Sequence, residues 1–551
     1  MVLFQYSLSG SNGTQEEPQE LIKQLETHAV TKEQLSIKVN EIYARLVRVE
    51  KQCIESHKEL AQSKAKLSEC QWQAHVLLQQ TLLDEHFDFF KVSQHPSASP
   101  ALRGLADKYQ TPARMWRYGV HSFFEQLLQK SPDSTEHMLN FIYFSFRMIT
   151  CLLECVPDFR ETWVQCLGDL ARYRIAIDKK DREIWIRVSR YWYNQDPDRS
   201  AENGRIQHHL AVLARPDILQ QFFHYTKAVI SVRPFPDAFN SIIELITPLM
   251  DVPTNNRSLV TSFMHTHGAL LIQVPVEEFI SRENVFLTTL QNEITQVGRS
   301  GQQGVQLMSC NISAIFQYGN THGVRETDFT LKLRNPTAED RLASMEWASS
   351  TSSTAIHTAH RELSSQLISR ASSLAFHTLI VMLGQVGDRN MYPSVHISIA
   401  FVWCLTLNPT AIQRLEPLVP WSLLATYLNT LFDSTINISN IEDESFPILD
   451  DLTTQQLPED FLIRGQAWSR LYYPERFFEG APTEDNRPST EGLSTLIPRR
   501  ERCLWLGVRI AAFARWMIYD RKTRQFTPTR LADEFAPVAQ SSAYLYSSSR
   551  G

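Results

Sequence analysis

The most constraining feature of this sequence is a long N-terminal stretch without helix-breaking residues. No proline occurs between Pro18 and Pro96, and no glycine occurs between Gly13 and Gly104. Positions in alternating steps of four and three carry mostly apolar or small side chains, at Leu35, Val39, Ile42, Leu46, Val49, Cys53, Leu60, Leu67, Cys70, Ala74 and Leu77, with Ser56 and Ser63 at the two remaining positions. Residues at this spacing share one face of a helix. The stretch predicts one long helix, either packed inside a bundle, which we favour, or paired in a coiled-coil dimer.

Helical spacing of apolar residues recurs through most of the remaining chain. Residues 204–236 are typical of a helical pair, with small side chains on the first helix, a break at Pro216, and aromatic side chains on the second helix before Pro234. Tetratricopeptide-type pairs use such faces to approach closely. Glycine, which tight turns require, supplies only 19 of the 551 residues. Since the alternation typical of strands is rare, the sequence predicts an all-α helical bundle or solenoid.

Changes in composition along the chain predict its division into domains. Residues 1–16 are polar and expected to be disordered, residues 17–250 form a first helical domain, residues 251–535 form a second domain, and residues 536–551 form a disordered tail. Residues 291–366 are rich in Ser, Thr, Gly and Gln. Such a composition is typical of linkers or mobile loops, so a flexible segment is expected inside the second domain.

Charge and cysteine content restrict the partners and the compartment. The formal net charge of −6 argues against general electrostatic binding to nucleic acid, although a local basic face is compatible with it. The eight cysteines form no CxxC pair and no secretory signal begins the chain, which favours the nucleus or the cytoplasm. The apolar segment 395–407 contains His396 and is too short to span a bilayer. We therefore predict a buried helix there and no membrane partner.

The motifs of common enzyme classes are missing from the sequence. It contains no GxxxxGK[ST], no GxGxxG and no HExxH, and its histidine pairs have no cysteine or acidic residue at ligand spacing. The acidic residues near 442–451 lack the flanking α/β pattern of a metal-dependent nuclease, which leaves a nuclease as the weakest alternative. We expect no catalytic activity, no cofactor, no bound metal and no small-molecule substrate.

Three sequence blocks resemble the ever-shorter-telomeres/SMG family. Residues 166–174 read CLGDLARYR, residues 204–214 read GRIQHHLAVLA and are followed by YTKAVISVRPFPDA, and residues 457–465 read LPEDFLIRG. The resemblance covers about residues 20–520 and is most specific in the first two blocks, which occur in order. It implies a 14-3-3-like N-terminal domain with tetratricopeptide-type pairs, followed by a C-terminal stack of helical hairpins.

The resemblance also implies a phosphoserine pocket, which needs fixed cations with hydrogen-bond donors. Arg172 and Arg174 stand in the CLGDLARYR block. Residues two apart on a helix do not share a face, so we prefer Arg172. Aligning an earlier helix on Trp116 places His121 where the family has a lysine, with Arg117 as a substitute. The alternative is that Arg172 is a structural arginine paired with an acid.

Basic residues are interleaved with aromatic residues in two stretches, 172–190 and 499–530. This mixture suits single-stranded nucleic acid, through phosphate contacts and base stacking. The candidate nucleic-acid-binding residues are Lys179, Lys180, Arg182, Arg187, Arg190, Arg499, Arg500 and Arg502. The alternative is an ordinary amphipathic helix, in which the aromatic residues face the core and the cations face water.

Together these features predict a non-catalytic adaptor of nonsense-mediated mRNA decay or of the telomerase complex. Its expected partner is a phosphorylated protein, a decay factor in the first case. The alternative is direct binding of telomerase RNA or of telomeric single-stranded DNA. A homo- or hetero-dimer is compatible with the N-terminal helical stripe.

Overall fold

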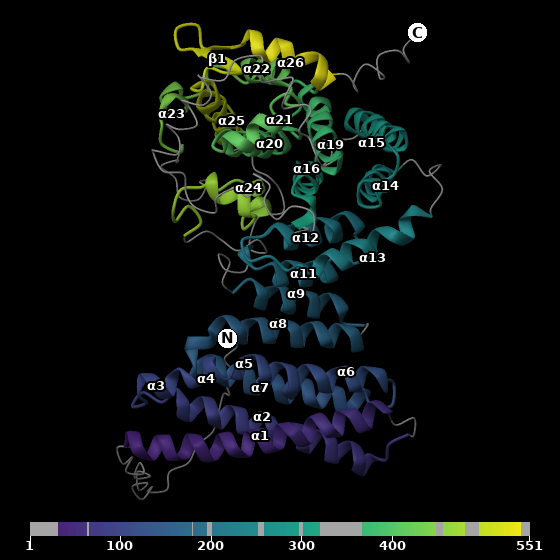
Figure 1. The fold of residues 1–551 in the computed structure, drawn as a ribbon, viewed down its shortest axis with the longest axis vertical. Helices are drawn as coiled ribbons and strands as arrows, with labels where there is room; N and C mark the ends of the chain where they lie inside the picture. The colour runs from purple at the N-terminus through teal and green to yellow at the C-terminus, as the bar shows by residue number, and fades with distance from the viewer. Residues whose placement is uncertain are drawn as a thin grey trace, which may run out of the picture. The chain divides into compact units, whose positions relative to one another are not determined.

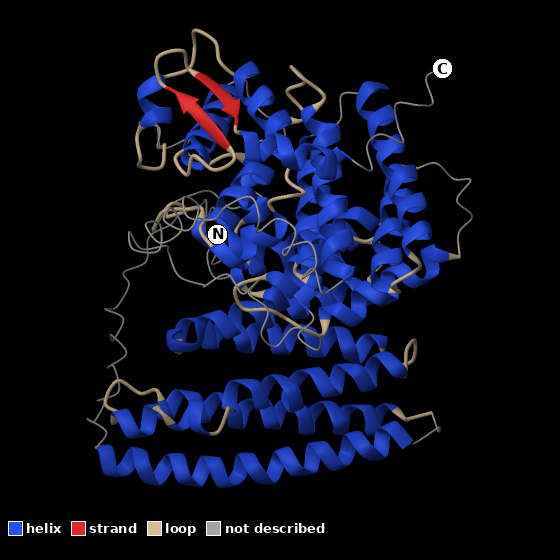
Figure 2. Cartoon of the chain, turned by 45° about the horizontal axis from the view of Figure 1, so that its top comes forward, coloured by secondary structure: helices blue, strands red, loops and turns tan. Residues whose placement is uncertain are grey.

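The computed structural model describes residues 31–62, 66–178, 180–195, 201–251, 258–296, 301–319, 366–447, 456–479 and 495–540. Helices dominate these ranges (Figure 1), and the sheet within them is one antiparallel hairpin (Figure 2). The all-α prediction is therefore confirmed.

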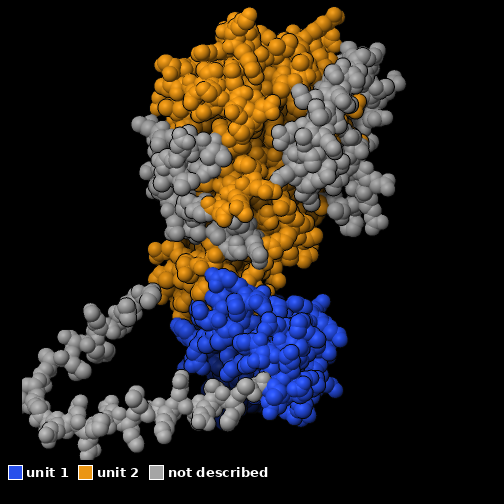
Figure 3. Space-filling model, turned by 90° about the vertical axis from the view of Figure 1, so that its left-hand side faces the viewer, with its two compact units in different colours: residues 1–160 blue, residues 161–551 orange. Residues whose placement is uncertain are grey.

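The chain divides into two compact units, Met1–Arg160 and Glu161–Gly551 (Figure 3). This division precedes the boundary that composition predicts near residue 250. The predicted disordered segment 1–16 and residues 541–551 of the predicted tail lie outside the described residues, whereas residues 536–540 of that tail are helical, contrary to the prediction.

The first unit contains α1 (Lys32–Gln62), α2 (Glu69–Ser93), α3 (Pro100–Arg103), α4 (Leu105–Lys108), α5 (Thr111–Arg114), the π-helix η1 (Met115–His121), α6 (Ser122–Gln129), α7 (Thr135–Cys155) and the 3-10 helix η2 (Pro157–Phe159). The second unit begins in α8 (Arg160–Ile177) and continues with α9 (Arg182–Tyr193), α11 (Gly204–Leu213), α12 (Ile218–Ile230), α13 (Ala238–Met250), α14 (Leu259–Leu271), α15 (Val276–Gln296), α16 (Gly301–Ile315), η3 (Gln317–Gly319), α19 (Gln366–Leu383), α20 (Tyr392–Thr406), α21 (Pro409–Leu415), α22 (Trp421–Thr430), α23 (Ile438–Glu442), α24 (Pro458–Ile463), η5 (Ala467–Leu471), α25 (Leu496–Ala511), β1 (Met517–Asp520), β2 (Gln525–Pro528) and α26 (Arg530–Gln540).

The N-terminal apolar stripe is distributed over two helices, so the prediction of one long helix is wrong. α1 ends at Gln62, and Ser68 begins α2 through a capping box with Gln71, which satisfies backbone donors that would otherwise be unpaired. The first half of the stripe is buried in unit 1, where α1 packs along α2. The pattern then loses its register, because α2 buries Trp72 and Leu83 while Leu77 is 64% exposed.

The helical pair predicted from residues 204–236 is confirmed as α11 and α12, which pack against each other. Asn203 caps α11, and its side chain accepts a hydrogen bond from the Arg205 amide. A Cβ at Gly204 would lie 2.3 Å from the Ala228 carbonyl oxygen of α12. Only glycine permits this approach of the two backbones.

The flexible segment predicted for residues 291–366 is wrong at its N-terminal end. α15 continues to Gln296, and α16 is a core helix that packs against α12, α19 and α20. Its polar side chains pair inside the protein: Asn311 lies 3.1 Å from His267 Nε2 and donates to Thr378 at 3.1 Å. The polar composition suggested a linker. The sequence did not show that these polar side chains form hydrogen bonds with residues far away in the chain. Residues 320–365 lie outside the described part.

The apolar segment 395–407 falls in α20, whose residues from Pro393 to Thr406 are all buried, as predicted. Among the described helices, α7 is long and apolar enough to cross a bilayer by length and composition alone. Core helices pass the same test, and Phe141 and Leu152 of α7 are fully buried.

Three histidines are buried deeply enough to stay neutral in the folded protein. Burial lowers the pKa of His86, His224 and His267 to about 3 in each case. His224 and His267 bond to side-chain oxygens of Gln207 and Asn311. For His86, neither ring nitrogen has a hydrogen-bond partner among the described residues.

These histidines make stability depend on pH. Their folded pKa lies below the unfolded value of about 6.5, so the unfolded chain binds more protons as the pH falls through 6.5. The free energy of unfolding should therefore decrease by about 1.4 kcal/mol per pH unit for each histidine below that pH. In His86→Leu the unfolding free energy should fall less steeply below pH 6.5, by about 1.4 kcal/mol per pH unit, because one buried neutral histidine is removed. Denaturant titrations at several pH values between 7.5 and 5 measure it, and an unchanged slope would contradict the buried neutral state of His86.

Candidate functional site

The CLGDLARYR block forms a buried network around one carboxylate. Asp169 lies on α8 and is 3% exposed. Its Oδ1 accepts a 2.6 Å hydrogen bond from the Tyr193 hydroxyl of α9 and lies 2.9 Å from His209 Nδ1 of α11. Arg172 Nη2 lies 3.5 Å from the same oxygen. One acid therefore joins α8, α9 and α11.

The glycine of the same block allows α9 to approach α8. A Cβ at Gly168 would lie 2.4 Å from the Tyr193 ring, well inside van der Waals contact. The Ser189 hydroxyl donates a 2.9 Å hydrogen bond to the Gly168 carbonyl oxygen. Gly168 and Asp169 thus act together in packing α9 against α8.

Burial and the neighbouring charges change the pKa values of Asp169 and His208. Burial by itself raises the pKa of Asp169, but His209, then Arg172 and Tyr193, outweigh it and hold the pKa well below its usual range. Burial, followed by the charges of His209, Arg172 and Arg205, lowers the pKa of His208 to about 4. The side chains of Arg172 and Arg205 therefore both lie near enough to His208 to act on its charge, and Asp169 acts in the opposite direction.

Arg172 is the member of this network that reaches the surface. Its side chain is 27% exposed, while its Nε is buried and has no hydrogen-bond partner among the described residues. Its ion pair with Asp169 is long, at 3.5 Å. Arg174 points elsewhere: its Nη2 lies 3.1 Å from Asp178, and its guanidinium group lies over the Trp185 ring. The two arginines thus have different partners, as expected for residues two apart on a helix.

The other two phosphate-binding candidates belong to the first unit. Arg117 and His121 lie in the π-helix η1, where the Arg117 guanidinium group lies 5.3 Å from the centre of the Tyr118 ring. His121 lies 4.0 Å from Glu125, and both side chains are 47% exposed. Arg172 and Arg174 belong to the second unit, so a pocket that combines all four residues stays a prediction.

The LPEDFLIRG block forms a second buried ionic network. Glu459 of α24 receives two hydrogen bonds from Arg499 of α25, at 2.7 and 2.8 Å, and lies 2.9 Å from His396 of α20. Asp460 accepts a 2.7 Å hydrogen bond from Arg502 and a 3.0 Å hydrogen bond from the Tyr473 hydroxyl. This carboxylate pair joins helices that are distant in sequence.

The same block is tied to the α11–α12 pair. Lys227 of α12 is 3% exposed, and its Nζ donates a 2.8 Å hydrogen bond to the Leu462 carbonyl oxygen. The Val232 amide donates to the Gly465 carbonyl oxygen at 3.0 Å. Gly465 has a φ of +81°, a left-handed conformation that favours glycine. The second and third sequence blocks therefore meet inside one unit.

The structure revises the candidate nucleic-acid-binding residues near the C-terminus. Arg499 and Arg502 are 2% and 3% exposed and are paired with Glu459 and Asp460, so neither guanidinium group faces a nucleic acid. Arg500 binds Asp433 at 2.7 Å and the Leu431 carbonyl oxygen. The sequence did not reveal this, because their partners lie about 40 to 70 positions away in the chain.

The remaining candidates gather on and before α9. Lys180 and Arg187 are exposed, Arg190 is partly exposed, and Lys179 lies outside the described residues. Arg182 donates a 3.0 Å hydrogen bond to the Arg215 carbonyl oxygen. Tyr191, one of the aromatic residues interleaved with these cations in the sequence, is 58% exposed, whereas Tyr193 is buried.

The described residues contain no group of three or more His, Cys, Asp and Glu side chains arranged to hold a metal ion. His208 bonds to Ser241 and His209 to the Asp169 network, so this histidine pair is structural. His265 and His267 also have different partners, the Leu249 carbonyl oxygen and Asn311.

Breaking the second network should destabilise the protein strongly. Glu459→Gln leaves the buried Arg499 charge without its counter-ion, which costs about 3–5 kcal/mol of unfolding free energy. Replacing both partners, as in Glu459→Leu with Arg499→Met, should recover most of that loss. Denaturant unfolding measures both.

The same change on the surface is the control for that experiment. Glu479 pairs with Arg476, but the two side chains are 69% and 84% exposed. Glu479→Gln should therefore change the unfolding free energy by less than about 1 kcal/mol. Equal effects of the two Glu→Gln substitutions would contradict the role given to burial.

Comparison with known proteins found a distant similarity. No family model matches the chain. EST/SMG-like protein 2 of Saccharomyces cerevisiae (strain ATCC 204508 / S288c) is 23% identical over 248 residues, which is 42% of this chain and 21% of that protein. The match therefore spans about a fifth of the relative's length. The all-helical fold and this similarity support a distant relationship of the chain to an EST/SMG-like family.

Proposed function

We propose that the chain is a non-catalytic adaptor that binds a phosphorylated protein partner in nonsense-mediated mRNA decay or in the telomerase complex. The similarity to an EST/SMG-like protein supports the family but not the partner. The proposal rests on the position of Arg172, which is paired with a buried acid and is partly exposed at the surface. This guanidinium group lies 3.5 Å from the buried Asp169, and both Arg172 and Arg205 lie near enough to His208 to lower its pKa.

A phosphate group suits that position for a physical reason. A phosphate carries nearly two negative charges. The planar guanidinium group of an arginine can donate two parallel hydrogen bonds to two oxygens of that phosphate. Arg205 is exposed and supplies a second positive charge near the same histidine. His208 is neutral at pH 7, so Arg172 and Arg205 would be the charged anchors. Arg172 is therefore both a structural residue and the proposed phosphate ligand.

A second function is favoured by the exposed face of α9. Arg187 and Tyr191 are four residues apart and share one side of the helix, with the Tyr191 ring 58% exposed. A cation beside an exposed ring suits single-stranded RNA or DNA, because the cation contacts the phosphate and the ring stacks on a base. Under this alternative the chain binds the nucleic acid of the same assembly directly.

Paired charge-removing variants distinguish the two functions. Arg172→Gln should weaken binding of a phosphoserine peptide by about tenfold or more, because a charge-assisted hydrogen bond contributes about 1.5–3 kcal/mol. Glutamine is preferred to glutamate there, since Arg172→Glu would place a second carboxylate beside Asp169. Arg187→Gln removes the same charge from exposed α9 and should leave peptide binding unchanged. Fluorescence anisotropy with a phosphoserine peptide library measures both variants.

The nucleic-acid alternative is tested on the same proteins with a single-stranded RNA oligonucleotide. If it is correct, RNA affinity falls steeply with salt, and both Arg187→Gln and Tyr191→Ala weaken it while Arg172→Gln does not. Peptide binding that is equal for the phosphorylated and unphosphorylated forms, or that survives in Arg172→Gln, would exclude the phosphate-binding role. Thermal unfolding of each variant shows whether its fold is retained.

A further inference from the structure

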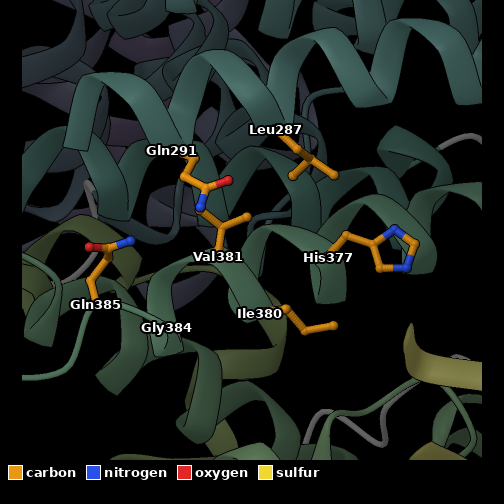
Figure 4. A pocket seen from close by; sticks show the side chains of 7 residues that line it. All are labelled: Leu287, Gln291, His377, Ile380, Val381, Gly384 and Gln385. Atoms are coloured by element: carbon orange, nitrogen blue, oxygen red, sulfur yellow. The ribbon is translucent and has the colours of Figure 1, made fainter. Parts of the chain in front are cut away.

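A hollow of about 200 Å³ opens between α15 and α19 of the second unit, away from the Asp169 network (Figure 4). Leu287 and Gln291 of α15 line one wall, four residues apart. His377, Ile380, Val381 and Gly384 line the other wall at helical spacing along and just after α19, with Gln385 following. The two glutamines, one from each wall, lie toward one end of the hollow, and His377 lies toward the other end (Figure 4).

A buried carboxylate fixes the histidine of this hollow. Glu283 of α15 is 1% exposed, and its Oε1 lies 2.9 Å from His377 Nδ1. The Ser373 hydroxyl lies 3.1 Å from the same nitrogen. A carboxylate that accepts the Nδ1 proton leaves the lone pair of the neutral ring on Nε2. Among the described residues no hydrogen bond to Nε2 occurs, so the hollow contains an oriented acceptor without a protein donor.

The size and charge of the hollow restrict its ligand. Sites for small molecules occupy about 300–1,000 Å³, so this hollow suits a single side chain. Its lining contains no lysine or arginine, which disfavours the phosphates of a nucleic acid. The amide groups of Gln291 and Gln385 both donate and accept hydrogen bonds, as the backbone of a peptide requires. Neither of these two glutamine side chains forms an ion pair or hydrogen bond with the described residues.

We propose that this hollow is a second docking site, which binds one tyrosine or tryptophan side chain of a short segment of a partner protein. Leu287, Ile380 and Val381 contact the ring. His377 Nε2 accepts the O–H or N–H of that ring, and the two glutamines bind the flanking backbone. Aromatic side chains with a polar tip combine a large apolar surface with such a bond, which makes them frequent anchors at protein interfaces.

Short peptides displayed on phage and selected on the full-length protein identify the ligand. The selected peptides should share a tyrosine or a tryptophan. Replacing the shared residue by phenylalanine, or by 1-methyltryptophan in a tryptophan peptide, should weaken binding about tenfold, because the donor to His377 is lost. Anisotropy with labelled synthetic peptides measures this loss. Selected peptides without a shared aromatic residue, or full affinity of the phenylalanine peptide, would overturn the proposal.

A rim substitution tests the location of the site without changing the core. A Cβ at Gly384 would make only ordinary contacts, the nearest at 3.5 Å from the Ile380 carbonyl oxygen. Gly384→Arg should therefore fold normally and fill the mouth of the hollow, which should abolish binding of the selected peptides. Gly104→Arg is the matched control, because Gly104 is also exposed and its added Cβ would lie 3.5 Å from a carbonyl oxygen. Peptides that bind Gly384→Arg as tightly as the wild type would place the site elsewhere.

Discussion

Buried carboxylates hold the second unit of this protein together. Asp169, Glu459 and Asp460 are each at most 3% exposed, and each is bonded to side chains of other helices. A buried charge is tolerated only when it is paired and its oxygens are hydrogen-bonded. The positions of α9, α11, α20 and α25 around these acids are therefore coupled, since moving one helix would leave a charge unpaired in a region without water.

This constraint explains why the sequence blocks of the family resemblance are mostly structural. Gly168 accommodates the Tyr193 ring, Gly204 accommodates the α12 backbone, and Gly465 adopts a left-handed turn. Arg499 and Arg502 neutralise buried acids. The exception is Arg172, which is bonded to the buried network but reaches the surface. A ligand at that position would bind to a cation that the fold already holds in place.

The two proposed binding regions share one physical principle. At Arg172 and at His377, a buried acid holds a functional side chain in one orientation while another part of that side chain stays available. Such preorganisation reduces the entropy that binding costs. The α9 face differs, because Arg187 and Tyr191 are exposed side chains on a helix and have no comparable support.

Several properties followed from local sequence alone. Helical periodicity, the scarcity of glycine and the break at Pro216 predicted an all-α chain, the α11–α12 pair and the buried α20, because these depend on residues near one another in the chain. The register of α2 and the core position of α16 did not follow. Leu77 lies on the wrong side of its helix for the stripe, and Asn311 is buried because His267 and Thr378 satisfy its amide.

The sequence by itself therefore determined which segments are helical and which residue types could bind phosphate or nucleic acid. Only the tertiary structure decided which cations are available. Arg499 and Arg187 look alike in sequence, but one pairs with a buried acid 40 positions away and the other faces water. The same holds for His377, whose partner Glu283 lies 94 positions earlier. The physical reason is that ion pairing and burial depend on contacts between distant segments, whereas helix formation depends on neighbours.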